Sequence, residues 1–128
     1  MTDNQVLFDS NIWIGYFLQS NEKIALLVES AESKILTSIL SFHEVAKILE
    51  RKERSVAFIR EAMRFMRENS TVVGLNEDIA VDAVVWCTKN KLSTVDSMIY
   101  QSAMVSNAIV VTADSDFDGL SKVCKVHL

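Results

Sequence analysis

The stretch VLFDSNIWIGYFL, Val6 to Leu18, predicts how the fold begins. Its first three residues, Val6 to Phe8, form a short β-favouring run that ends at Asp9. The run from Ile12 to Leu18 is apolar on nearly every side, which favours a helix that is largely buried. The chain therefore opens with a strand followed by a helix.

Strands and helices continue to alternate along the rest of the chain. Further strands are predicted over Lys34–Thr37, Thr71–Leu75 and Ile109–Thr112, with a last edge strand over Lys125–His127. Helices are predicted over Ile24–Ala31, Ser41–Arg51, Ser55–Asn69, Asn76–Asn90 and Thr94–Asn107, the last two capped by Asn76 and Thr94. This order predicts an α/β fold with a largely parallel sheet.

Length and composition indicate one folded unit over residues 1–128. The chain has 49% hydrophobic and 23% charged residues, no proline and three glycines, so it can bury a core and shows no linker. Its formal net charge of -4 is opposite to that of simple electrostatic nucleic-acid binders. If the protein handles nucleic acid, something other than net charge must hold it.

The cysteines and the hydropathy pattern predict a soluble cytoplasmic protein without a membrane span. Cys87 and Cys124 form no CxxC pair, so neither a disulfide framework nor a thiolate zinc site is indicated. The run from Ile12 to Leu18 is far shorter than a membrane helix, and Asp3 stands where a signal peptide would carry positive charge.

Acidic residues from remote parts of the chain are predicted to meet at one edge of the sheet. Asp9 closes the first strand, Glu44 lies in the helix after the second, and Asp96 lies in the first turn of a helix. Asp114 and Asp116 directly follow the fourth strand. Parallel sheets bind ligands in the crevice beyond the carboxyl ends of their strands. These carboxylates are therefore candidate site residues.

Each of these acids also has a purely structural explanation. Glu44 fits a capping box that begins at Ser41, and Asp96 would favourably face the positive end of its helix. Asp9 can itself be an N-cap, and the two acids after the fourth strand can form a turn. Clustered carboxylates, however, repel one another unless cations neutralise them, and their joint placement favours a functional role.

Hard divalent cations are the natural compensation for such a cluster. Carboxylate oxygens without thiolates or a histidine cluster suit Mg²⁺ or Mn²⁺. Two such ions about 4 Å apart can activate water for attack on a phosphodiester and stabilise the leaving oxygen. Ser10, Asn11 and Thr112 are short polar side chains beside the acids that can orient the ligands or a bound water.

Four segments together resemble the PIN domain family, specifically the small VapC-type toxins of toxin-antitoxin pairs. Val6–Asn11 is similar to the family's opening strand and first acid, and Thr37–Glu44 to its serine-then-glutamate segment. Asp96–Ala103 followed by Ile109–Phe117 resembles its acid-opened helix, strand and T-x-D-x-D-F loop. The resemblance implies a PIN-like, Rossmann-like three-layer domain with a sheet of about four to five mainly parallel strands flanked by helices.

The resemblance also implies an activity and partners. It implies a Mg²⁺- or Mn²⁺-dependent endoribonuclease in which Asp9, Glu44, Asp96 and Asp114 hold metal and catalyse, with Asp116 as an auxiliary acid. It further implies a homodimer and a small antitoxin that places a basic side chain among the acids. Surplus apolar residues on the helices, notably Ile12, Trp13, Phe17, Met63 and Met66, are expected to lie partly at an interface.

Arg60, Arg64 and Arg67 lie on one helix face and form a weak candidate RNA-binding stripe. A solvated face in which Arg64 pairs with neighbouring glutamates is the simpler explanation.

Other functions remain as alternatives. A haloacid-dehalogenase-like phosphatase also opens with a strand ending in an acid, but Asn11 occupies the position of its second aspartate. A catalytically silent interaction domain would not need Glu44 and Asp96 to converge with Asp9. A housekeeping PIN-domain nuclease for RNA processing would share the predicted site.

Overall fold

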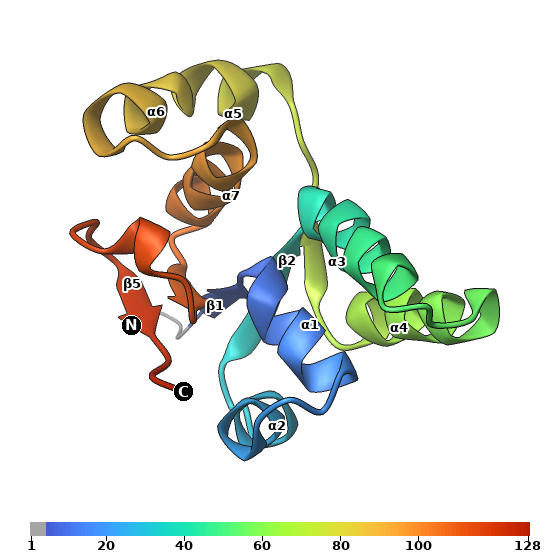
Figure 1. The fold of residues 1–128 in the computed structure, drawn as a ribbon. Helices are drawn as coiled ribbons and strands as arrows, with labels where there is room; N and C mark the ends of the chain where they lie inside the picture. Colours follow the sequence, from blue (N-terminus) through green and yellow to red (C-terminus); the bar gives the residue numbers. More distant parts are fainter. Residues whose placement is uncertain (1–4) are drawn as a thin grey trace.

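The computed structural model describes residues 5–128, and Asp3 lies outside them. Five parallel strands form one sheet in the order β3-β2-β1-β4-β5 (Figure 1). The strands are β1 (Gln5–Phe8), β2 (Lys34–Ser38), β3 (Thr71–Val73), β4 (Ile109–Thr112) and β5 (Val123–Lys125). The predicted α/β class with a parallel sheet is confirmed.

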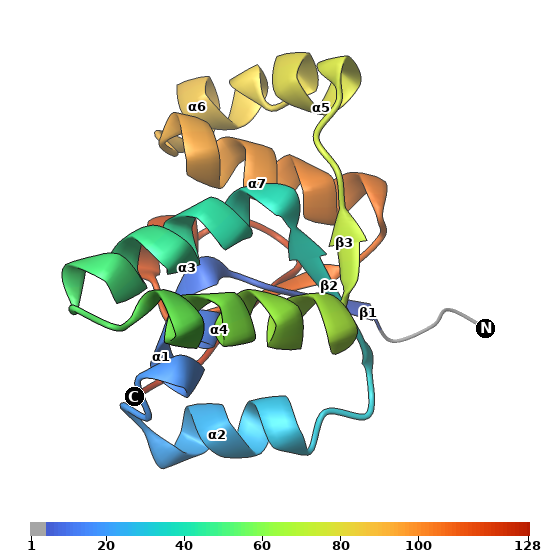
Figure 2. The same ribbon diagram turned by 90° about the vertical axis from the view of Figure 1, so that its right-hand side faces the viewer.

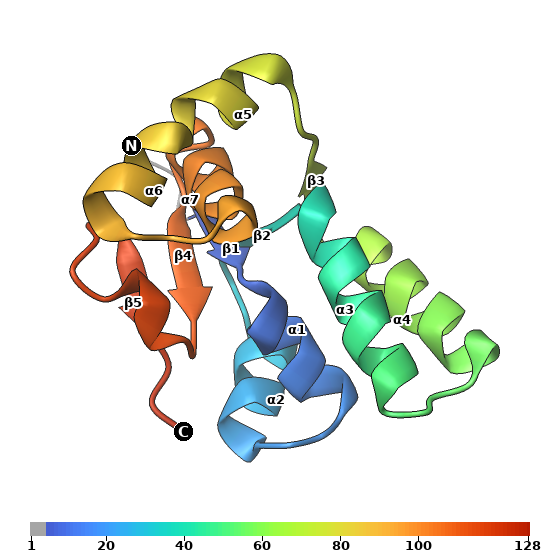
Figure 3. The same ribbon diagram turned by 45° about the horizontal axis from the view of Figure 1, so that its top comes forward.

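Helices lie on both faces of this sheet, in three layers (Figures 1 and 2). They are α1 (Ser10–Phe17), α2 (Glu22–Glu29), α3 (Ile39–Arg51), α4 (Val56–Glu68), α5 (Glu77–Asp82), α6 (Val84–Asn90) and α7 (Thr94–Val105), with a 3₁₀ turn, η1, over Ser115–Phe117. Helices α5 to α7 cover one face, and α1 and α2 cover the other. Helices α3 and α4 lie side by side and extend the second layer past α1 (Figure 3).

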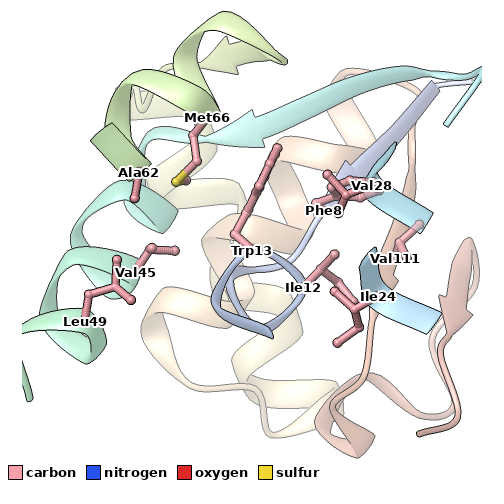
Figure 4. Packing of buried hydrophobic residues seen from close by; sticks show 10 residues of the cluster. All are labelled: Phe8, Ile12, Trp13, Ile24, Val28, Val45, Leu49, Ala62, Met66 and Val111. Atoms are coloured by element: carbon pink, nitrogen blue, oxygen red, sulfur yellow. The ribbon is translucent and has the colours of Figure 1, made fainter. Parts of the chain in front are cut away.

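The alternation of side chains along the central strands divides the core in two. Leu7 and Val110 point to the layer of α7, whereas their neighbours Phe8 and Val111 point to the layer of α1. On the α1 side of the sheet, Trp13 lies between Met66 of α4 and Phe8 (Figure 4). The ring centroids of Phe8 and Trp13 are 5.4 Å apart in an edge-on arrangement. Burying both faces is what a parallel sheet requires.

The residues expected to supply an exposed apolar surface are mostly core residues. Ile12, Trp13 and Met66 are fully buried, and Phe17 and Met63 pack partly buried against them. For Ile12, Trp13 and Met66 the expectation was wrong because α4 folds back over α1 and buries these side chains within one chain. The exposed apolar side chains lie elsewhere, for example Val81 and Val84, which are 60% and 58% exposed.

Several element boundaries differ from those predicted. The predicted helix 76–90 is two helices, because the chain bends at Ala83 and lays Trp86 on α7, where its indole N–H donates to Gln101 at 2.8 Å. The N-cap of α7 is Ser93 rather than Thr94. Strand β5 pairs two residues earlier than predicted, at Val123–Lys125, because its register with β4 matches Val123 to Val110.

Two further sequence expectations can be compared with the described residues. None of their helices combines the length and apolar character that a membrane crossing needs. Both cysteines are free, as expected, with Cys87 half-buried and Cys124 exposed.

Candidate active site

The carboxyl edge of the sheet holds a cavity of about 250 Å³ lined by acids from four parts of the chain. Asp9 leaves β1 as the N-cap of α1, and Glu44 projects from the second turn of α3. Asp96 comes from the first turn of α7, and Asp114 follows β4 as the N-cap of η1. The structure thus brings together all four acids that were expected to hold metal.

Asp9 is the most buried member of the cluster, with 4% of its surface exposed. Its Oδ1 accepts a hydrogen bond from the Ser10 backbone N–H, and its Oδ2 accepts one from the Thr112 hydroxyl, each at 2.8 Å. The pKa of Asp9 is raised to about 7, mainly by burial. The two hydrogen bonds oppose this rise, and the charges of Asp96 and Glu44 add to it. The N-cap role and the site role therefore belong to the same carboxylate.

Glu44 is held by a serine from another helix. The Ser10 hydroxyl donates to Glu44 Oε1 at 2.5 Å and lies 2.9 Å from the Ser41 hydroxyl. The capping box predicted at Ser41 is wrong: Ser38 caps α3, because β2 runs straight into the helix, and Ser41 is buried inside it. Glu44 is thereby free to face the cavity rather than its own helix terminus.

Asn11 and Thr112 tie the first and fourth strand ends to each other. The Asn11 amide donates to Thr112 Oγ at 3.3 Å, and Asn11 Oδ1 accepts from the Ala113 backbone N–H at 3.2 Å. Thr112 Oγ also accepts from the Asp114 backbone N–H at 2.9 Å. The three short polar side chains predicted near the acids, Ser10, Asn11 and Thr112, therefore all fix carboxylates or the loop that carries one.

A second grouping of acids lies toward η1. One carboxylate oxygen from each of Asp96, Asp114 and Asp116 falls within 4.8 Å of the others. The pKa of half-buried Asp96 is raised to about 6, mainly by burial and next by the charge of Glu44. The hydrogen bond from Ser93 lowers this pKa, and the charges of Asp114 and Asp116 make smaller contributions that raise it. Asp116, expected only as an auxiliary, does not line the cavity but belongs to this tight trio.

The acids have no cationic partner within residues 5–128. The two ion pairs found there join Arg64 to Glu61 and Lys125 to Asp118, and neither involves a cavity acid. The buried carboxylate of Asp9, which forms no ion pair there, and a trio of carboxylate oxygens within 4.8 Å are a donor set that suits Mg²⁺ or Mn²⁺. The residues present fit a divalent cation.

Sequence reasoning missed two cations that line the same cavity. Lys47 and Arg51 of α3 line it together with Ile14 and Ile48. Their spacing of three and seven residues from Glu44 places them on the same side of the helix, a signal that the sequence contained.

The predicted arginine stripe on α4 lies elsewhere. Arg60, Arg64 and Arg67 do not line the acidic cavity. Arg64 pairs with Glu61 at 2.5 Å and lines a separate cavity of about 320 Å³, in which aromatic side chains such as Tyr16 and Phe65 lie beside charged ones.

Comparisons with known proteins agree with the observed fold. The model of the PIN domain family matches residues 6–123. No curated protein sequence matches the chain significantly.

Among solved structures, a toxin-antitoxin complex from Klebsiella pneumoniae is similar at 22% identity and a TM-score of 0.76, covering 94% of this chain and 96% of that one. VapC20 of Mycobacterium tuberculosis, described as a sarcin-ricin loop cleaving toxin, is similar at 16% identity and a TM-score of 0.77, with 92% and 96% covered. VapBC-1 of nontypeable Haemophilus influenzae gives 19% identity and a TM-score of 0.74, with 94% and 97% covered. These likenesses show a shared fold.

Proposed function

The chain belongs to the PIN domain family, and from this premise we propose that it is a divalent-metal-dependent endoribonuclease that hydrolyses RNA phosphodiester bonds. The observation that supports this most is the convergence of Asp9, Glu44, Asp96 and Asp114 on one cavity, where none of the four forms an ion pair within residues 5–128. A silent interaction domain has no need to keep such mutually repelling groups together. In the phosphatase alternative a second acid would occupy the position of Asn11, whose amide instead bonds Thr112.

In this proposal the four cavity acids hold Mg²⁺ or Mn²⁺, and Asp116 supports them next to Asp96 and Asp114. The bound cation would polarise the scissile phosphate and lower the pKa of an attacking water. Ser10 contributes by orienting two acids at once, through its backbone N–H to Asp9 and its hydroxyl to Glu44. Such outer hydrogen bonds fix the direction in which a carboxylate offers its lone pairs.

We further propose that the chain acts in the cytoplasm as the toxin of a type II toxin-antitoxin pair, and as a homodimer. The similar structures described as a toxin-antitoxin complex and as a cleaving toxin support the first part. Exposed Val81 and Val84 on α5 and α6 are candidates for a subunit interface. An antitoxin that inserts a basic side chain among the acids would occupy the cation's place and block entry of phosphate.

Cleavage of a labelled single-stranded RNA by the purified protein in Mg²⁺, in Mn²⁺ and in EDTA tests the activity. Asp96→Asn, purified identically, is the inactive comparison, and Asp82→Asn at the exposed end of α5 is the matched control. We expect cleavage by wild-type and Asp82→Asn only with metal, and none by Asp96→Asn. Equal cleavage in EDTA, or full activity of Asp96→Asn, contradicts the proposal.

The biological role has a separate test. Induced expression should arrest growth, and co-expression of a small neighbouring reading frame should restore it. Cleavage without growth arrest favours the housekeeping nuclease instead.

A further inference from the structure

We propose that Lys47 and Arg51 form a second subsite in the acidic cavity, which binds an RNA backbone phosphate next to the cleaved one. This inference rests on the proposed nuclease function and adds a binding site to it. It concerns where the RNA strand lies relative to the acids, and thus which part of the cavity supplies affinity rather than chemistry.

Helix α3 carries the acidic and the basic parts of the cavity on one side. Glu44, Lys47 and Arg51 all line it, and their spacing of three and then four residues keeps them on the same helix face. With a rise of about 1.5 Å per residue, Arg51 lies about 10 Å along the helix axis from Glu44. The basic side chains therefore begin one turn beyond the nearest acid and continue for another turn.

Within residues 5–128, Lys47 and Arg51 form no ion pair with an acid. Both residues are exposed. Ile48 of the same helix and Ile14 of α1 also line the cavity, so an apolar wall accompanies the charged groups. Unpaired cations at one end of a cavity whose other end is acidic suit a ligand with more than one phosphate.

An RNA strand is such a ligand. One phosphate can lie over the carboxylates with their metal, while the next meets the lysine and arginine, whose N–H groups donate to phosphate oxygens. The strand would then gain local affinity although the chain as a whole carries a net charge of -4. The arginines of α4 are less suited, because Arg64 is paired to Glu61 beside another cavity.

Lys47→Gln and Arg51→Gln test the subsite, with Lys34→Gln as the matched control. Lys34 is exposed at the first residue of β2, at the sheet edge opposite the cavity. Steady-state cleavage of one labelled single-stranded RNA is measured in Mg²⁺ over a range of salt concentrations. In the two cavity variants we expect KM to rise roughly three- to tenfold with kcat little changed. We expect the slope of log KM against log salt to fall by about 0.7 for each lost phosphate contact.

Calorimetric titration with Mn²⁺ alone distinguishes a phosphate subsite from a structural role of Lys47 and Arg51. Removing a positive charge near the acids should leave Mn²⁺ affinity unchanged or increase it, so metal and RNA affinities should not fall together. A weaker Mn²⁺ affinity in Lys47→Gln, or a KM equal to that of Lys34→Gln, overturns the subsite. If wild-type protein does not cleave RNA at all, the proposed function itself fails, which is a distinct result.

Discussion

Replacing Asp9 by asparagine should change how the stability of the metal-free protein depends on pH. Asp9 has a pKa of about 7 in the folded chain and an ordinary value of 3.8 when solvated. The folded state therefore keeps a proton that the unfolded state has already lost. Folding takes up a proton in this range, so wild-type stability should fall as the pH rises from about 4 to about 7.

The size of the effect follows from the same two values. Each pH unit in that range costs about 1.4 kcal/mol, and about two units separate pH 5 from the folded pKa of about 7. Wild-type protein should therefore lose about 3 kcal/mol from this group between pH 5 and pH 8. Asparagine cannot titrate, so the variant should not show this loss. Its disturbed contact with the Thr112 hydroxyl adds an offset that does not depend on pH.

Urea unfolding in EDTA at pH 5 and pH 8, monitored by the fluorescence of buried Trp13 and half-buried Trp86, measures the effect. The stability of Asp9→Asn relative to wild type should increase by about 3 kcal/mol between the two pH values. Asp82→Asn, on the exposed end of α5, should show no such change. If Asp9→Asn and wild type change in parallel, burial does not raise the pKa of Asp9 and the electrostatic argument for the site is wrong.

Three further outcomes are expected. Mn²⁺ affinity should rise between pH 6 and pH 8, because Mn²⁺ binding must displace the proton that Asp9 holds with a pKa of about 7. Calorimetry in two buffers of different ionisation enthalpy would measure this proton release. Thr112→Val removes the hydroxyl that donates to Asp9, so a carboxyl NMR titration should show a still higher pKa there and Mn²⁺ should bind more weakly. Met66→Ala should destabilise the fold by about 2–4 kcal/mol in urea unfolding, because the side chain is fully buried. The same variant should leave Mn²⁺ binding unchanged, and a loss of metal binding would mean that the core and the site are coupled.

Some acids of the candidate site could be recognised from the residues next to them in the sequence. Asp9 and Asp114 were recognisable because each follows a short β-favouring run, and strand ends in a parallel sheet share an edge. The N-cap role of Asp9 was equally recognisable, whereas Asp114 was expected only to form a turn; the structure shows that both acids cap a helix and line the cavity. Glu44 was different: its capping box was plausible by spacing but wrong, because the helix begins at Ile39 after the Ser38 cap.

Some errors came from contacts between segments far apart in the sequence. The apolar residues of α1 and α4 look like surplus surface when each helix is considered alone, but the two helices bury Trp13 and Met66 against each other. The arginines of α4 looked suitable for phosphate by periodicity alone. Which face of α4 lies near the acids is decided by its packing beside α3, and these arginines do not line the cavity.

The sequence by itself determined the α/β class, the parallel strands and the acids at their ends, because these depend on periodicity and on residues next to one another in the chain. Only the tertiary structure decided that Ser10 of α1 would hold Glu44 of α3, and that carboxylate oxygens of Asp96, Asp114 and Asp116 would lie within 4.8 Å of one another. The physical reason is that hydrogen bonds and carboxylate contacts act over a few ångströms in space. Their partners are chosen by how helices pack on the sheet, which no local pattern of residues specifies.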